Sequence, residues 1–218
     1  MKNDWSIVLG SRSPRRKALL SLLVPEQNIL VLPPKHTQEN FDKVTQWKDV
    51  ERRVLELAEE KCEDVLQQLK SQPSSKKVLA TITADTIVVA TNESDQPVVL
   101  GQPREQAGKN WQETVKTWFK QFYAGRWHVV MTALCVDSPK GRVLKLSKTE
   151  VQFTKDVDKW LDWYLNTEEP FDKAGGYGIQ GLADVFVTAV KGSVSNVVGF
   201  PLREVVEALQ ELELFPLS

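Results

Sequence analysis

Residues 6–23 read SIVLGSRSPRRKALLSLL, and this stretch predicts a β-strand that passes through a short polar loop into an α-helix. Pro14 favours the first helical turn because its φ is already helical and it has no N–H to leave unpaired, and Ser13 is the expected N-cap. The cations Arg15 and Arg16 lie beside the free N–H groups of the helix N-terminus, an arrangement that attracts phosphate. The alternative is a capped surface helix with a solvated basic turn.

The bulk composition describes an ordinary globular protein. Its 218 residues predict one domain covering residues 1–218, and 41% hydrophobic with 26% charged residues is typical of soluble proteins. A net charge of −1 without an extended basic face argues against duplex nucleic acid as a partner. The chain shows no signal peptide and no apolar run of membrane-spanning length, so we expect no membrane contact. Cys62 and Cys135 lack metal-ligand spacing and are expected as buried thiols, which fits the cytoplasm.

Outside the opening stretch, predicted strands and helices alternate, which indicates an α/β fold with a mixed sheet. The expected strands cover residues 28–34, 78–90, 98–100, 127–137, 142–153 and 183–189. The expected helices cover residues 47–69 and 104–123, with one more after Thr154 and a last one from Pro201. The tight turn at residues 138–141 predicts a hairpin, and residues 168–181, with four glycines, are expected as a loop.

Two charged residues stand out against apolar surroundings. Asp85 lies in the middle of the apolar strand 78–90, where a carboxylate is costly unless a cation, a metal or several donors meet it. The alternative is an exposed Asp at a bulge or a sheet edge. Lys61 falls on or beside the buried stripe of helix 47–69, so it either extends along the helix to water or points into a site.

The unusual polar residues fall in loops and at strand ends, which in α/β folds often meet in one cleft. Cations able to bind an anion, carboxylates able to hold a hard cation and an amide able to read a base are all present. They are Arg15, Arg16, Lys61 and Lys173, then Glu39 and Asp85, and finally Gln180. This set suits phosphoryl chemistry with a divalent metal, although the chain has no GxxxxGK[ST] motif.

Five blocks of the sequence together resemble one family. LGSRSPRRKALL, ADTIV, GQP, EPFDKAGGYGIQG and NVVGFPL occur in this order between about Ile7 and Leu209, as in the Maf family of nucleoside triphosphate pyrophosphatases related to septum-formation inhibitors. The resemblance implies a Maf/Ham1-like (inosine triphosphatase-like) α/β fold, in which a mixed sheet with flanking helices forms two lobes around a cleft. It also implies a homodimer.

The activity that the resemblance implies is hydrolysis of a nucleoside triphosphate to monophosphate and pyrophosphate, with Mg²⁺ or another divalent cation such as Mn²⁺. The form DKAGGYGIQG looks like the branch that acts on dTTP and UTP, so we expect pyrimidine nucleotides, modified ones included, as substrates.

The resemblance also implies roles for single residues. Asp85 matches the family's proton acceptor, and it is expected to hold the metal together with Glu39. Arg15, Thr86 and Gln180 match positions tied to substrate choice. The full set expected to bind or select substrate is Ser11, Arg15, Arg16, Lys61, Thr86, Gln102, Lys173 and Gln180.

One block departs from the family pattern. The usual GKP is GQP here, so the neutral amide of Gln102 replaces a cation that would face phosphate. Triphosphate binding is expected to weaken unless Arg104 supplies the charge. A nucleotide-binding regulator of cell division or septation with little catalysis is therefore the alternative function. A purine-directed pyrophosphatase on a related fold is a third, and Gln180 argues against it.

Overall fold

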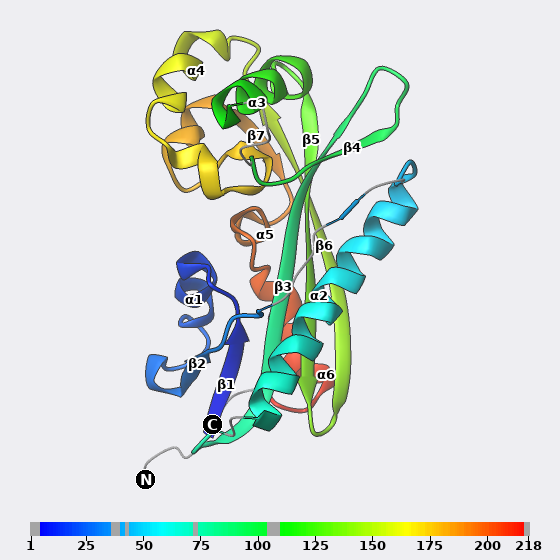
Figure 1. Ribbon diagram of the computed structural model, residues 1–218, viewed down its shortest axis with the longest axis vertical. Coiled ribbons are helices and arrows are strands. Elements are labelled where there is room, and N and C mark those ends of the chain that lie inside the picture. The colour runs from blue at the N-terminus through cyan, green and yellow to red at the C-terminus, as the bar shows by residue number, and fades with distance from the viewer. Residues whose placement is uncertain (1–4, 36–39, 42–43, 72–73, 104–109, 216–218) are drawn as a thin grey trace.

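The computed structural model describes residues 5–35, 40–41, 44–71, 74–103 and 110–215. Its centre is a seven-stranded mixed sheet in the order β2-β1-β3-β5-β6-β7, with β4 paired to β3 (Figure 1). The strands are β1 (Trp5–Gly10), β2 (Ile29–Val31), β3 (Lys77–Thr91), β4 (Pro97–Leu100), β5 (Trp127–Ser138), β6 (Gly141–Phe153) and β7 (Val187–Lys191). β1 runs parallel to β2 and β3, and the remaining pairings are antiparallel. The mixed α/β sheet that was predicted is therefore confirmed.

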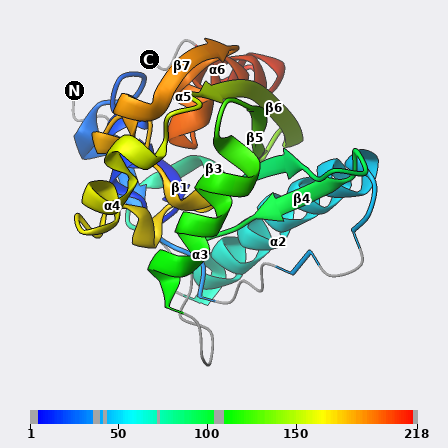
Figure 2. The same ribbon diagram turned by 90° about the horizontal axis from the view of Figure 1, so that it is seen from above.

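Helices cover both faces of this sheet. The α-helices are α1 (Pro14–Leu20), α2 (Trp47–Ser71), α3 (Trp111–Trp118), α4 (Asp158–Leu165), α5 (Val194–Val198) and α6 (Leu202–Glu211). The short helical turns are η1 (Glu26–Asn28), η2 (Phe119–Tyr123), η3 (Glu169–Asp172), η4 (Ala174–Gly176) and η5 (Leu182–Phe186). Seen from above, α2 and α6 lie on opposite sides of the long strands (Figure 2). None of the helices in the described ranges has the length and apolar character needed to cross a bilayer.

The period-two alternation of strand β3 decides which core each of its residues enters. Ile87 and Val89 face α2 and pack with its apolar stripe. On the other face, Ile82 belongs to a core with β1, α1 and α6, whereas Val88 belongs to an aromatic core with α3 and α4. Thr86 therefore lies on the second face between the two cores, where the halves of the molecule meet.

Most expected elements form near their predicted positions, although the strand expected over 28–34 pairs only over Ile29–Val31, and two further elements differ. Residues 183–189 were expected as one strand, but η5 occupies Leu182–Phe186 and only Val187–Lys191 pair as β7. Ala183 and Phe186 are buried in the aromatic core, so the apolar run reflects a packed helical turn as well as a strand. The described part of the expected helix 104–123 begins at Trp111 and changes to π-helical geometry at Phe119.

Candidate active site

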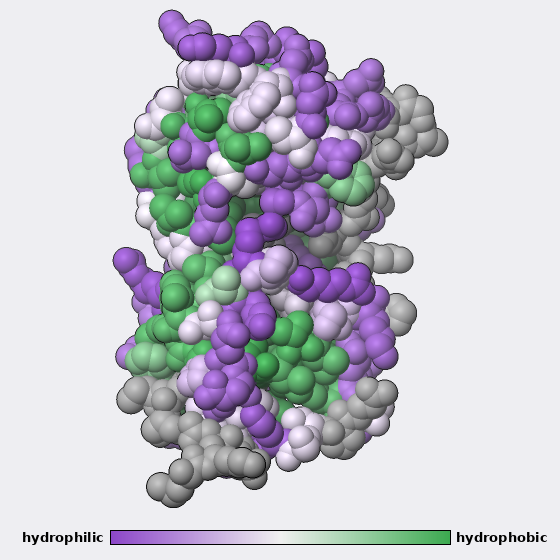
Figure 3. Space-filling view, turned by 90° about the vertical axis from the view of Figure 1, so that its left-hand side faces the viewer, coloured by the Kyte–Doolittle hydropathy of each residue, from purple (hydrophilic) through white to green (hydrophobic). Residues whose placement is uncertain are grey.

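A cleft of about 1300 Å³ lies between the two halves of the molecule. Figure 3 shows a hydrophilic band that crosses the waist between the halves, on the side where α1 and α4 lie. Nine of the predicted site residues line the cleft, and they come from five separate stretches of the chain. They are Ser11, Arg15, Arg16, Lys61, Asp85, Thr86, Gln102, Lys173 and Gln180. The tenth, Glu39, lies outside the described residues.

The loop from β1 into α1 forms one end of the cleft as the sequence predicts. Ser13 is the N-cap, with its side chain accepting from the backbone N–H of Arg16 at 3.4 Å, and Pro14 begins the helix. The Ser11 hydroxyl accepts from the N–H of Ser13 at 3.1 Å, which tightens the turn. Because α1 has only seven residues, we assign the attraction for anions mainly to the arginine side chains that line the cleft.

Arg16 is engaged with acceptors of the protein itself. Its Nε donates to Gly199 O at 2.8 Å, and Nη1 donates to Ala84 O at 2.7 Å. Its Nη2 donates to Thr86 Oγ1 at 2.9 Å. These bonds join the start of α1, the middle of β3 and the end of α5. Arg16 therefore carries positive charge at the cleft and also holds these three segments together.

The bonds of Arg16 continue into the protein as a chain of hydroxyl groups. Thr86 Oγ1, which accepts from Arg16, lies 3.0 Å from Thr132 Oγ1. Thr132 in turn donates to Asn196 O at 3.1 Å. Since Thr132 gives its proton to Asn196 O, the Thr86 hydroxyl has two acceptors for its own proton, Thr132 Oγ1 at 3.0 Å and Gly199 O at 3.5 Å. The Thr86 hydroxyl is thus part of the support of the site.

Lys61 and Asp85 form an ion pair inside the protein. The side chains meet between α2 and β3, with Lys61 Nζ bonded to Asp85 Oδ1, and the two residues are 8% and 2% exposed. Among the described residues, Asp85 Oδ2 has no hydrogen-bond partner, although it is buried. The pair excludes both alternatives from the sequence, since Asp85 is not at an edge and Lys61 does not extend to bulk water. It leaves the second oxygen of this cleft-lining carboxylate without a hydrogen-bond partner among the described residues.

The glycine-rich loop forms the opposite wall and rests on buried aromatic residues. Gly175 and Gly176 both have φ of +70°, which only glycine adopts without strain. Tyr123 donates its hydroxyl proton to Gly175 O at 2.9 Å. His128 Nε2 and the Tyr177 hydroxyl are 2.8 Å apart in the same aromatic core, and burial lowers the pKa of His128 to about 3. The loop is therefore held by polar groups that reach out of an apolar cluster.

Gln102 connects this loop to the end of β4. Its Nε2 donates to Asp172 O at 3.2 Å, and the neighbouring Gly101 O accepts from Gly175 N at 2.9 Å. Lys173 Nζ is bonded to the Asp172 carboxylate and donates to Glu169 O at 3.3 Å. The amide that replaces the family's lysine thus bonds to the backbone of the opposite wall. Arg104, the suggested substitute cation, lies outside the described residues.

The donor set of the cleft fits a divalent cation bound together with phosphate. Mg²⁺ prefers oxygen ligands and is commonly bound through one or two carboxylates plus substrate phosphates and water. Asp85 supplies a carboxylate of this kind, and its Oδ2 is buried and without a hydrogen-bond partner in the described part of the chain. The described lining also carries more cations than carboxylates, which favours a polyanionic ligand over the metal alone. The cations are Arg12, Arg15, Arg16, Lys61 and Lys173, and the carboxylates are Asp85, Glu169 and Asp172.

Sequence reasoning missed several residues that shape the cleft. Glu169 and Tyr177 line it from within a quoted block, yet neither was assigned a role. Thr132 and Asn196 are buried behind it, and the signal that was available was the polar character of residues inside apolar stretches. Gly199 contributes a backbone carbonyl, and because every residue type has one, the sequence does not indicate this role.

Comparison with known proteins places these features in a wider group. Residues 6–212 match the family model described as "Maf-like protein". A dTTP/UTP pyrophosphatase from Caldicellulosiruptor bescii is 34% identical over 208 residues, which cover 94% of each chain. One from Neisseria meningitidis is 32% identical, covering 95% of this chain and 94% of the relative. One from Pyrococcus horikoshii is 36% identical, covering 92% of this chain and 94% of the relative.

Proposed function

The chain belongs to the Maf family, and on this premise we propose that it is a pyrophosphatase that hydrolyses pyrimidine nucleoside triphosphates such as dTTP and UTP. Relatives that carry the name dTTP/UTP pyrophosphatase and align over more than nine-tenths of the chain support this substrate class. The observation that carries the proposal is the buried Asp85, which lines a cleft rich in cations, is paired with Lys61 and has one oxygen without a hydrogen-bond partner among the described residues.

In the proposed reaction, Asp85 is the general base. A water oxygen bonds to the α-phosphorus, its proton passes to Asp85 Oδ2, the α–β bridging bond breaks, and pyrophosphate leaves. Lys61 compensates the charge of the carboxylate and directs its second oxygen to the cleft. Arg15 and Lys173 line the cleft and would supply positive charge to the triphosphate, and the Gln180 amide would offer a donor and an acceptor to the edge of the base.

We further propose that a divalent cation, Mg²⁺ or Mn²⁺, takes part. The Asp85 carboxylate would contribute to holding this cation from the described part of the chain, and Glu39 remains a proposed ligand. When bound, such an ion neutralises negative charge on the phosphate oxygens. The ion therefore complements Arg15 and Lys173, whose charges act on the same phosphates.

The direct test is a panel of nucleoside triphosphates with detection of released pyrophosphate, with and without Mg²⁺. The proposal expects dTTP and UTP to be hydrolysed faster than purine triphosphates, and chelation of the metal to stop the reaction. Release of orthophosphate in place of pyrophosphate would contradict the reaction, and a purine preference would contradict the substrate class.

The alternative, a nucleotide-binding regulator of cell division, rests on the single departure at Gln102. The amide bonds to Asp172 O and contributes no charge to the cleft. Tight triphosphate binding by calorimetry, together with negligible pyrophosphate release, would favour the regulator. Robust pyrimidine turnover by the natural Gln102 protein would exclude it.

Two further parts of the proposal concern the setting of the enzyme. The free, buried thiols of Cys62 and Cys135 support a reducing compartment, which we propose to be the cytoplasm. The family resemblance supports a homodimer. Light scattering coupled to size-exclusion chromatography measures the mass directly, and a monomer at micromolar concentration would contradict the dimer.

A further inference from the structure

The carboxylate of Glu169 lies in the wall of the cleft and is held by two donors. Its Oε2 accepts from the backbone N–H of Leu182 at 2.8 Å. Its Oε1 accepts from the hydroxyl of Tyr164 at 3.4 Å, and this hydroxyl also lies 3.3 Å from Gly176 O. Burial, and the negative charge of Glu169 beside it, raise the pKa of Tyr164, so the hydroxyl keeps its one proton, which Glu169 and Gly176 O share.

Glu169 is thereby joined to the short turn that carries Gln180. The N–H of Gly181 donates to Gly178 O at 3.0 Å, which closes a four-residue turn with Ile179 and Gln180 in the middle. The turn is therefore closed by its own hydrogen bond. It is anchored at its exit by Glu169, through the next residue, Leu182.

The glycine at the end of this turn is explained by the same contact. A Cβ atom built on Gly181 would lie 2.4 Å and 2.5 Å from the two carboxylate oxygens of Glu169. Real Cβ atoms do not approach oxygen so closely, so a larger residue would push the carboxylate away. The close approach therefore depends on two residues of the sequence: Glu169, which supplies the carboxylate, and Gly181, which leaves room for it.

We propose that Glu169 is a positioning residue that sets base recognition by holding the Gly178–Gly181 turn so that Gln180 faces the base. This inference rests on the proposed function, because it concerns how a pyrimidine is selected at the same site. Glu169 acts through Gln180 and takes no part in the proton transfer at Asp85. Both carboxylate oxygens accept hydrogen bonds from protein donors, Leu182 N–H and the Tyr164 hydroxyl, so we assign Glu169 a structural contact and not a contact with phosphate or metal.

The first test is Glu169→Ala, assayed with dTTP and with dGTP. We expect KM for dTTP to rise about tenfold, which corresponds to about 1.4 kcal/mol of lost binding, while kcat changes less than threefold. The preference for dTTP over dGTP falls by a similar factor, because Gln180, which is proposed to contact the base, is displaced. Glu169→Gln keeps an oxygen to accept from Leu182 and an amide that can bond to Tyr164, so its KM stays within threefold of the natural protein.

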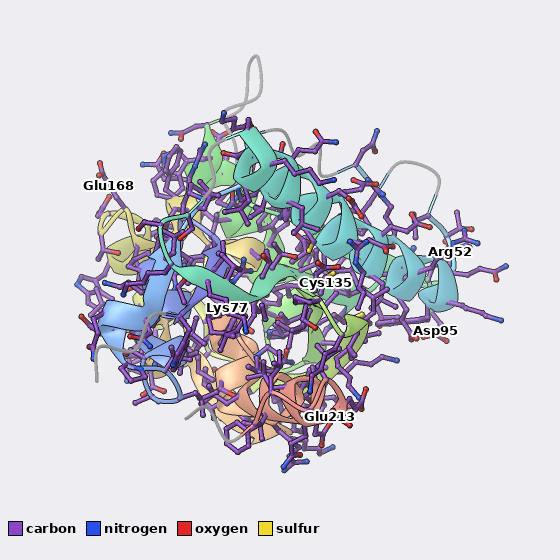
Figure 4. The ribbon with its side chains drawn as sticks, turned by 90° about the horizontal axis from the view of Figure 1, so that it is seen from below. Arg52, Lys77, Asp95, Cys135, Glu168 and Glu213 are labelled. Atoms are coloured by element: carbon purple, nitrogen blue, oxygen red, sulfur yellow. The ribbon has the colours of Figure 1, made fainter. Side chains whose placement is uncertain are left out.

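Glu168→Ala is the matched control. It removes the same side chain one residue earlier, and Figure 4 shows Glu168 at the periphery of the molecule. We expect its KM and its preference for dTTP to be unchanged. A control variant as impaired as Glu169→Ala would show that the loop responds to any change, and would overturn the specific role of Glu169.

A double-substitution cycle with Gln180→Ala separates positioning from general damage. If Glu169 acts through Gln180, Glu169→Ala has no further effect on KM once the Gln180 amide is gone. A tenfold increase that persists in the Gln180→Ala background would overturn the proposal, and so would an unchanged KM in Glu169→Ala alone.

Amide hydrogen exchange tests the positioning without any turnover. Glu169→Ala is expected to speed exchange at Leu182 at least tenfold, whereas Glu169→Gln keeps its protection. An inactive natural protein would refute the proposed function, yet this exchange result would still decide whether Glu169 holds the turn. Equal protection at Leu182 in all three proteins would refute the inference.

Discussion

Asp85→Asn removes the proposed general base and also breaks the buried ion pair with Lys61. Both residues are nearly inaccessible, with exposed fractions of 2% and 8%, so solvent does not screen their interaction. The amide oxygen of the new asparagine can still accept a bond from Lys61, but it carries no charge. The substitution is nearly isosteric, which limits its effect to the chemistry and the charge.

The structure sets the expected size of both effects. Loss of a positioned general base lowers kcat by about 10²- to 10⁴-fold. Breaking a buried pair by removing one partner costs about 3–5 kcal/mol, because Lys61 is left as an uncompensated charge. Domains have about 5–15 kcal/mol of stability, so we expect a weakened but folded protein. Adding Lys61→Met removes the remaining charge, and stability then recovers while activity does not.

The assay combines pyrophosphate release from dTTP with urea unfolding of four proteins. They are the natural protein, Asp85→Asn, Lys61→Met and the double variant. Asp162→Asn, which removes a carboxylate from the exposed pair with Lys116, is the control and should keep full activity. Activity of Asp85→Asn within tenfold of the natural protein would refute the role of Asp85 as base. Additive stability losses in the double variant would refute the coupling of the pair.

Three further outcomes are expected. Arg15→Ala should weaken triphosphate binding about tenfold at low salt and less at moderate salt, because the contact is ionic; calorimetry showing equal affinity would remove Arg15 from the site. Gln102→Lys should raise kcat/KM roughly three- to thirtyfold for triphosphates, since a charged donor replaces a neutral one, and no gain would show that another cation already fills the role. Burial lowers the pKa of His128 to about 3, so as the pH falls the unfolded chain binds a proton before the folded protein does. Urea unfolding should therefore show that the free energy of unfolding decreases between about pH 6.5 and pH 3, by at most about 1.4 kcal/mol per pH unit. His128→Gln should flatten that dependence, and an unchanged slope would assign it to other groups.

Local patterns predicted much of this fold and site. The N-cap at Ser13 and the amphipathic stripe of α2 depend on residues close in sequence, so they could be found without tertiary information. Asp85 was conspicuous because a carboxylate inside an apolar strand needs a partner, and Lys61 proved to be that partner. The family resemblance then assigned positions such as Gln180, which the structure brings into the same cleft.

What the sequence did not predict depends on contacts between distant residues. The stretch 183–189 was apolar enough for a strand, but burial of Phe186 among aromatic side chains favours a helical turn there. α5 has five residues, too few for a periodic pattern, and it ends at Gly199 with φ of +101°. The bonds of Arg16 to the carbonyls of Ala84 and Gly199 involve backbone acceptors, which any residue type supplies.

The bonds of Arg16 also have a consequence for the order in which the protein is made. Its acceptor Gly199 O lies 183 residues later in the chain, whereas Ala84 O and Thr86 are available much earlier. During synthesis, the sheet around β1 and β3 can pair while the ribosome is still far from residue 199. The bond from Arg16 to Gly199 O can form only after residue 199 has been synthesised, because synthesis proceeds from the N-terminus at a limited rate. A nascent chain therefore has β3 and Asp85 long before it has a finished site, and catalytic competence arrives only with the last helices.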